Sequence, residues 1–251
     1  NAPMLHNGES VGNQQGPSCD VAVDPIDGTS LTANGMNGAI SVIALAPRGT
    51  MFQPGSSFYM NKIVTGPEAA RDIDLRASAA ENIAAVARAK NLSINDITVV
   101  VLNRPRHESL ISEIRKAGAR IRLIQDGDVA AAIETARPNT GIDLLMGIGA
   151  APEGVITATA LRGLDAPFEG RLVFKNKGHR SRAEEMIDGD IERLWKRNDL
   201  CSSEDSLFIG TGVCSGRTKG VSLDGNTYSV ESEIIDVANG IHKFVKGTHS
   251  S

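Results

Sequence analysis

The sequence lacks the features that mark secreted, membrane-bound and nucleic-acid-binding proteins. Its three cysteines are scattered without C-x-x-C spacing, which favours reduced thiols and excludes a disulfide framework or zinc site (Cys19, Cys201 and Cys214). No apolar run approaches the roughly 18 residues of a membrane span, and no signal peptide is visible. The net charge of −4 at pH 7 favours neither nucleic acid nor an anionic membrane as a partner. We therefore expect a cytoplasmic globular protein.

Signatures of covalent and histidine-based catalysis are also absent. No G-x-S-x-G elbow surrounds a serine, so Ser30 and Ser215 lack the turn that exposes a nucleophilic hydroxyl. Four histidines are scattered and form neither a metal-binding set nor a triad (His6, His179, His242 and His249). With 251 residues, 41% apolar and 22% charged, the chain is an ordinary globular protein that can bury a substantial core.

The segment Asp24–Thr29 carries the strongest functional signal. It reads Asp-Pro-Ile-Asp-Gly-Thr and follows the apolar run Val21–Val23, which indicates a buried strand. The proline keeps the chain extended, the glycine allows close approach of a ligand, and the threonine supplies a donor and an acceptor. Hard cations such as Mg²⁺ are usually held by one or two carboxylates plus substrate phosphate, so the segment predicts metal–phosphate chemistry. An Asx-type turn closing a strand is the structural alternative.

The pattern of apolar and turn residues indicates an α/β protein. Strands are expected at Asp20–Asp24, Ala39–Ala46 and Ser57–Thr65, followed by a helix at Ser78–Lys90 with a capping box. Between residues 97 and 163, strands alternate with helices, which implies parallel pairing and right-handed crossovers. The expected strands there are Ile97–Leu102, Arg120–Gln125 and Ile142–Met146, and the helices are His107–Lys116, Val129–Ala136 and Glu153–Leu161.

The last third of the chain has a weaker pattern. We expect a surface helix at Glu184–Lys196 around Trp195, a strand over residues 206–213, and a closing hairpin at Gly225-Asn226. No internal repeat or low-complexity linker divides the chain. Residues 1–251 are therefore expected to form a single unit with approximate halves, 1–95 with the metal motif and 96–251 with the substrate groups.

Unusual polar groups stand at the ends of four expected strands. These segments are Asp24–Thr29, Arg104–His107, Asp126–Asp128 and Gly149–Gly154. Ligands bind outside the carboxyl ends of strands in an open α/β sheet, so the segments converge on one crevice if their strands share a sheet. Structural alternatives remain for each: a solvated loop for the arginines, a helix N-cap for Asp128, and helix-dipole stabilisation for Glu153. His107 is expected to start its helix or pack on the loop.

These polar residues suit hydrolysis of a phosphate ester without a covalent intermediate. Such a reaction needs an activated water and neutralised phosphate charge, both of which bound metal supplies. The natural metal ligands are the carboxylates of Asp24, Asp27 and Glu153. Thr29 is suited to orient the water, and Arg104 and Arg106 to clamp a second, non-reacting phosphate. The carboxylates of Asp126–Asp128 are suited to accept hydrogen bonds from sugar hydroxyls.

The segment Asp24–Thr29 is similar to the metal motif of the lithium-sensitive, metal-dependent sugar and inositol phosphatases. Further segments narrow the resemblance to class II fructose-1,6-bisphosphatase: Ala2–Leu5, Ala39–Val42, Phe58–Ile63, Arg104–His107, Asp126–Ala130 and Pro152–Gly154. The resemblance implies a layered α/β/α/β/α sandwich. It also implies a gluconeogenic phosphatase, dependent on Mg²⁺ or Mn²⁺, that removes the 1-phosphate of fructose 1,6-bisphosphate. A homo-oligomer, either a dimer or a tetramer, is the expected assembly.

The resemblance assigns roles to individual positions. Asp24, Asp27 and Glu153 would be metal ligands, and Asp24, Asp27 and Thr29 the catalytic residues. Substrate contacts would come from Asp27, Gly28, Thr29, Tyr59, Arg104, Pro105, Arg106, Asp126, Gly127, Asp128 and Ala150.

The sequence departs from the family pattern in several places. Family members carry an N-terminal stretch with metal-binding acidic residues ahead of Ala2–Leu5, whereas this chain opens at Asn1 without methionine. We therefore expect an N-terminal truncation that removes part of the metal site. Ala150 replaces a usual glycine and Ser30 a common threonine, and the match is weak from Gly163 onward.

Three functional alternatives stay open at this point. The first is fructose-1,6-bisphosphatase activity, and the second is sedoheptulose-1,7-bisphosphatase activity or both together. The third is a catalytically dead relic that binds sugar phosphates, which the truncated start favours. The retained Asp24, Asp27, Thr29 and Glu153 argue against the relic.

Overall fold

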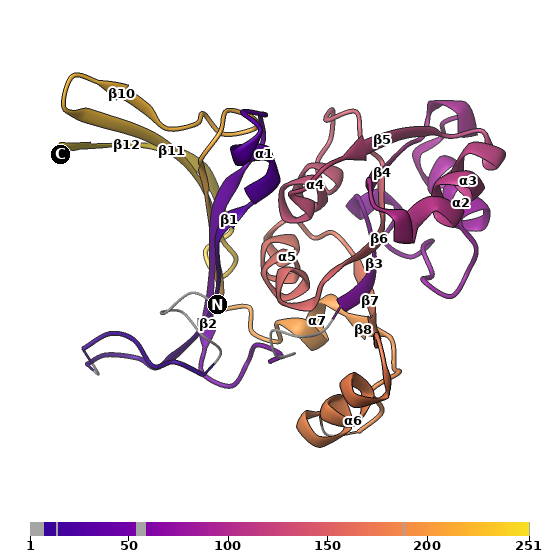
Figure 1. Ribbon diagram of the computed structural model, residues 1–251, viewed down its shortest axis with the longest axis horizontal. Helices are drawn as coiled ribbons and strands as arrows, with labels where there is room; N and C mark the ends of the chain where they lie inside the picture. The colour runs from indigo at the N-terminus through magenta and orange to yellow at the C-terminus, as the bar shows by residue number, and fades with distance from the viewer. Residues whose placement is uncertain (1–7, 14, 54–58, 188, 251) are drawn as a thin grey trace.

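A computed structural model describes residues 8–13, 15–53, 59–187 and 189–250, which form two sheets and the helices around them (Figure 1). The family-like segment Ala2–Leu5, residue 58 of Phe58–Ile63, and residues 57 and 58 of the third expected strand lie outside these residues. The α/β fold class is confirmed.

The first sheet is antiparallel throughout and combines both ends of the chain. Its strands are β1 (Cys19–Asp27), β2 (Ile40–Pro47), β9 (Leu207–Gly212), β10 (Ser222–Asp224), β11 (Thr227–Asp236) and β12 (Ile241–Ser250). The order is β1-β2-β9-β11-β10, with β12 also paired to β11. The hairpin predicted at Gly225-Asn226 is confirmed as the turn between β10 and β11.

The second sheet is mixed and comes from the middle of the chain. Its strands are β3 (Tyr59–Thr65), β4 (Thr98–Leu102), β5 (Arg120–Ile124), β6 (Leu144–Ala150), β7 (Phe168–Val173) and β8 (Trp195–Lys196), in the order β5-β4-β6-β3-β7-β8. Parallel pairing is confirmed where β4 meets β5 and β6, whereas β3 and β7 pair antiparallel. The condition that all four strands share one sheet is not met, because β1 belongs to the other sheet.

The helices are short to medium in length. They are α1 (Thr29–Ala33), α2 (Ala79–Lys90), α3 (Glu108–Ala117), α4 (Asp128–Thr135), α5 (Ala151–Gly163), α6 (Lys177–Met186) and α7 (Arg197–Leu200), with 3₁₀ turns η1 (Pro67–Ala69), η2 (Ile94–Asp96) and η3 (Pro105–His107). The predicted capping box of α2 is confirmed, with Ser78 and Glu81 bonding each other's backbone. Among the described residues, no helix has the length and apolarity that crossing a membrane requires.

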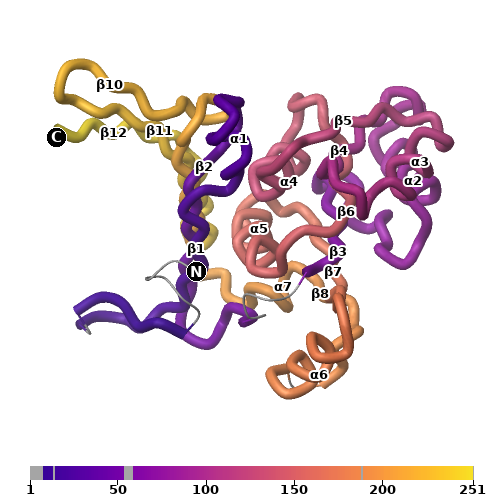
Figure 2. The backbone as a smooth tube through the Cα atoms, in the orientation of Figure 1, coloured from indigo at the N-terminus to yellow at the C-terminus, as the bar shows by residue number. Residues whose placement is uncertain are grey.

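The elements stack in layers, and α4 and α5 lie between the two sheets (Figures 1 and 2). Alternate residues of β2, among them Val42 and Ala44, pack with Phe208 of β9 against these helices. On the far side of the second sheet, α2 and α3 cover a separate apolar cluster that includes Ile63 and Val99. The confirmed α/β architecture thus places the N-termini of α4 and α5 between two sheets.

The helix predicted at Glu184–Lys196 is wrong. The helix α6 begins at Lys177 instead, where the Asn176 side chain caps it by accepting the His179 backbone N–H at 3.0 Å. Trp195 lies in β8, with its ring 4.1 Å from that of Phe52. This long-range aromatic contact, which the local charge pattern does not reveal, favours the strand over a surface helix.

Candidate active site

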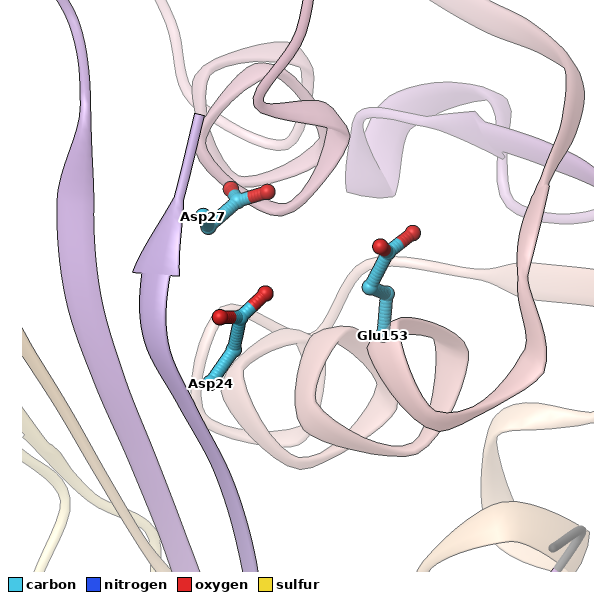
Figure 3. Close-up of side chains that lie close together, drawn as sticks. All are labelled: Asp24, Asp27 and Glu153. Atoms are coloured by element: carbon cyan, nitrogen blue, oxygen red, sulfur yellow. The ribbon is translucent and has the colours of Figure 1, made fainter. Parts of the chain in front are cut away.

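Three carboxylates from strand β1 and helix α5 meet at one point. Asp24 and Asp27 come from β1, Glu153 comes from the first turn of α5, and one oxygen of each lies within 4.8 Å of the others (Figure 3). Residues three apart on a regular strand point to opposite faces. The β1–β2 register shifts between Asp24 and Asp27, and this irregularity lets both carboxylates face α5. The convergence expected from sequence is therefore achieved between two sheets.

Backbone hydrogen bonds orient all three carboxylates, and Asp27 Oδ2 accepts the Ala130 N–H at 3.4 Å. Asp24 Oδ1 accepts the Ile26 N–H at 3.0 Å, which is the Asx-type turn considered as an alternative. Glu153 Oε2 accepts the Ala150 N–H at 3.0 Å and so caps the start of α5. Both structural interpretations hold, and neither prevents metal binding because each carboxylate has further lone pairs.

The electrostatics of the cluster favour a bound cation. Burial, followed by the charges of Asp128 and Glu153, raises the pKa of Asp27 well above its usual value. Burial and the charge of Asp128 raise the pKa of Glu153 to about 8, and burial raises the pKa of Asp24. Carboxylates that ionise this reluctantly lack a compensating charge, and a divalent cation with oxygen ligands would supply it. The three residues therefore fit a divalent metal ion.

Lys62 of β3 lies beside this cluster and was not predicted from sequence. Its side chain is 3% exposed, and its Nζ lies 2.6 Å from Asp128 Oδ2 and 3.6 Å from Glu153 Oε2. It also donates to the Ala150 carbonyl at 3.2 Å. Burial disfavours its charge, but the carboxylates of Asp128 and Glu153 more than offset this and raise its pKa. The sequence feature that could have indicated this role is a single lysine in the otherwise mostly apolar strand Tyr59–Thr65.

Gly149 leaves the space that the Lys62–Asp128 pair occupies. A Cβ at position 149 would lie 2.2 Å from Asp128 Oδ2 and 2.8 Å from Lys62 Nζ. Asp128 itself is the first residue of α4, and Gly127, with φ of 81°, is the N-cap. The interpretation of Asp128 as an N-cap is therefore wrong.

Asp126 joins the loop before α4 to the start of α1. Its Oδ2 accepts the Ser30 N–H at 3.0 Å and the Thr29 hydroxyl at 3.5 Å. Arg104 approaches its other oxygen at 3.9 Å. Gly28, which precedes α1, has φ of 101°, a value that favours glycine. Thr29 is exposed and therefore accessible to substrate.

Arg106 and Tyr59 meet at the end of the second sheet. The Arg106 Nε and Nη2 donate to the Ile148 carbonyl at 3.0 and 2.7 Å, and its guanidinium lies 5.6 Å from the Tyr59 ring centroid. Tyr59 pairs in register with Ala150, the residue before α5. Pro105, which begins the turn η3, is exposed. Predicted substrate-binding positions thus lie along the same sheet end that carries Glu153.

His107 has a structural role at this sheet end. Its Nδ1 contacts the Leu102 carbonyl and its Nε2 the Ile148 N–H, each at 2.7 Å. These partners require a neutral ring that donates from Nδ1 and accepts at Nε2. Burial lowers its pKa, which agrees with that state. The expectation that His107 starts its helix or packs on the loop is confirmed, because His107 is the N-cap of α3.

Comparison with known proteins identifies the family. The family model of the bacterial fructose-1,6-bisphosphatases, glpX-encoded, matches residues 1–249. The chain belongs to this family. Its members are metal-dependent phosphatases, and the chain is accordingly a hydrolase of phosphate esters.

Curated relatives of this glpX-encoded family support the assignment. The chain is 40% identical over 262 residues to the D-fructose 1,6-bisphosphatase class 2/sedoheptulose 1,7-bisphosphatase of Prochlorococcus marinus strain NATL1A, covering 99% of this chain and 78% of the relative. The proteins of the same name from strain MIT 9515 and from subspecies pastoris strain CCMP1986 / NIES-2087 / MED4 have the same identity and coverage.

Proposed function

We propose that this protein hydrolyses the 1-phosphate of fructose 1,6-bisphosphate to give fructose 6-phosphate and phosphate, with Mn²⁺ or Mg²⁺ as cofactor. The observation that carries the proposal is the cluster of Asp24, Asp27 and Glu153, whose ligand atoms lie within 4.8 Å of one another. In a member of this phosphatase family, such a cluster is the natural metal site.

Asp24, Asp27 and Glu153 would hold the metal. When bound, the metal polarises the phosphoryl group and lowers the pKa of a coordinated water from 15.7 towards about 7. Thr29 is the residue that accepts a hydrogen bond from the attacking water. Its own hydroxyl proton is directed to Asp126 Oδ2 at 3.5 Å, which leaves the oxygen lone pairs available.

The sugar bisphosphate would lie across the sheet end between the two sheets. Arg104 and Arg106 bind the non-reacting phosphate, and Asp126 and Asp128 accept hydrogen bonds from sugar hydroxyls. The remaining contacts come from Asp27, Gly28, Thr29, Tyr59, Pro105, Gly127 and Ala150. Binding of the distal phosphate contributes to positioning the reacting ester, because interactions remote from the reacting bond can lower the barrier.

Sedoheptulose 1,7-bisphosphate is the second candidate substrate. The curated relatives carry both activities in their names, which favours dual activity over a fructose-only enzyme. The two substrates differ by one carbon, and each carries a phosphate at both ends. One site therefore accommodates both if its binding region for the non-reacting phosphate accepts either chain length.

The test is phosphate release from each bisphosphate with and without Mn²⁺ or Mg²⁺. We expect metal-dependent release that Asp24→Asn abolishes. Asp224→Asn, which removes an exposed carboxylate from β10, is the matched control and should keep full activity. A folded wild-type protein that binds Mn²⁺ but releases no phosphate from either substrate would refute the proposal.

A further inference from the structure

Two cations lie beside the ring of Tyr59. Lys175 Nζ stands 4.2 Å from its centroid, and the Arg106 guanidinium stands 5.6 Å from it. Tyr59 pairs in register with Ala150 of β6 on one side and with Val173 of β7 on the other. The loops after β4 and β7 therefore bring their cations to one place, beside the start of α5.

Neither cation is neutralised by an acidic side chain in the part of the chain that the structure describes. Arg106 uses Nε and Nη2 on the Ile148 carbonyl, which fixes the guanidinium, and no carboxylate of the described residues forms a direct ion pair with it. Lys175 is exposed and contacts the aromatic ring rather than a carboxylate. Arg104, by contrast, already lies 3.9 Å from Asp126. Two cations beside one aromatic ring, without a direct ion pair to any described carboxylate, form a site for an anion with several acceptor oxygens.

The two cations and the carboxylate cluster lie at the same end of the second sheet. Tyr59 pairs in register with Ala150, and the Ala150 N–H donates to Glu153 Oε2 at 3.0 Å. Arg106 also lies near enough to Asp128 for its charge to lower the pKa of that carboxylate. A substrate with a phosphate at each end can therefore contact the carboxylate cluster with one phosphate and the cations with the other.

We propose that Lys175 binds the non-reacting phosphate together with Arg106 and allows the site to accept both six-carbon and seven-carbon bisphosphates. This inference rests on the proposed function and adds to it a residue that neither the motifs nor the family resemblance indicated. The guanidinium of Arg106 is held by the Ile148 carbonyl, so its position is fixed. Lysine is a point charge on a flexible four-carbon stem, so Lys175 follows a phosphate that moves with chain length.

The test compares Lys175→Ala with Lys177→Ala on three substrates. Lys177 is also exposed and begins α6 two residues later, which makes it a matched control. A lost charge-assisted hydrogen bond corresponds to roughly tenfold or more in affinity, so Lys175→Ala should raise KM that much for both bisphosphates. The kcat should hold, fructose 1-phosphate should be turned over as by wild type, and Lys177→Ala should change nothing. Lys175→Arg should recover part of the loss.

The outcomes separate this inference from the proposed function. Unchanged KM for both bisphosphates in Lys175→Ala, or an equal loss on fructose 1-phosphate, would overturn the assignment while leaving phosphatase activity in place. A loss confined to one bisphosphate would overturn the role in chain-length tolerance. Calorimetric titration with fructose 6-phosphate, which carries only the distal phosphate, tests the contact without turnover. Weaker binding by Lys175→Ala than by wild type and Lys177→Ala supports it, and equal binding overturns it.

Discussion

Replacing Lys62 by methionine tests the charge at the centre of the site. The Lys62 side chain is 3% exposed; methionine retains much of its stem but removes the ammonium, whose Nζ lies 2.6 Å from Asp128 Oδ2. Removing one partner of a buried ion pair costs about 3–5 kcal/mol, because the other charge stays in poorly solvated surroundings. With roughly 2–4 °C per kcal/mol for a chain of this size, we expect the melting temperature to fall by roughly 6–20 °C.

Lys90→Met is the matched control for thermal melts followed by circular dichroism. Lys90 is also largely buried and pairs with two carboxylates, Asp143 at 2.7 Å and Glu68 at 3.0 Å. Glu68 is 43% exposed, so solvent screens this pair and we expect a smaller loss of stability. Lys90→Met should also leave Mn²⁺ affinity and turnover unchanged. A Lys62→Met protein that melts within about 2 °C of wild type would refute the reasoning.

A double variant separates lost charge from lost packing. In Lys62→Met with Asp128→Asn, both members of the pair are neutral, so no buried carboxylate lacks a partner. We expect it to recover much of the melting temperature lost by Lys62→Met alone. A double variant no more stable than Lys62→Met would show that packing of the lysine stem, rather than its charge, was the contribution removed.

Four further predictions concern the metal and substrate groups. Glu153→Gln should lower Mn²⁺ affinity and turnover more than about 100-fold without lowering the melting temperature, because it relieves repulsion among buried carboxylates; equilibrium dialysis with Mn²⁺ and thermal melts check both parts. Because the pKa of Glu153 is raised to about 8 and that of Asp27 is also raised, Mn²⁺ displaces protons below pH 8, so its affinity should rise with pH in this range. Calorimetry in buffers of different ionisation enthalpy measures the protons released, and their absence would contradict the assignment. Gly149→Ala should destabilise the protein as Lys62→Met does, since its Cβ would meet both partners of that ion pair; equal melting of Gly149→Ala and wild type would disprove the contact. Arg106→Ala should raise KM for a bisphosphate far more than for a monophosphate, and equal effects would remove it from the distal site.

Local sequence indicated the carboxylate cluster, whereas the role of Lys62 depends on tertiary pairing that the sequence does not show. The motif Asp24–Thr29 indicates its chemistry because its residue types and spacing are contiguous in sequence. Lys62 becomes meaningful only when β3 pairs with β6 and brings its ammonium beside Asp128 and Glu153. A single lysine in a strand is otherwise equally consistent with a side chain that reaches solvent at an edge. The same limit applies to Lys175, whose neighbour Tyr59 is distant in sequence.

The strand and helix types between residues 97 and 163 followed from periodicity, but the sheet assignment did not. Alternating strands and helices predicted parallel pairing, which β4, β5 and β6 show. The same pattern carries no information that β1 joins a separate antiparallel sheet with β9 and β11 from the end of the chain. Convergence of the polar segments was nevertheless correct, because α4 and α5 lie between the sheets and begin at the site.

The negative charges of Asp128 and Glu153 are compensated to different extents, and this difference predicts how a bound metal affects the stability of the fold. Burial opposes ionisation of Asp128, but the ammonium of Lys62 offsets it and lowers its pKa. Lys62 stands farther from Glu153, whose pKa is raised from 4.5 to about 8. A raised carboxylate pKa stabilises the fold fully below pH 4.5, and that contribution is lost as pH rises towards 8. A bound cation favours the ionised form and so reverses the loss. The increase in melting temperature on adding Mn²⁺ should therefore grow between pH 5 and 8 in wild type and vary much less with pH in Glu153→Gln; an equal pH dependence in both would show that Glu153 is not the group that exchanges its proton for metal.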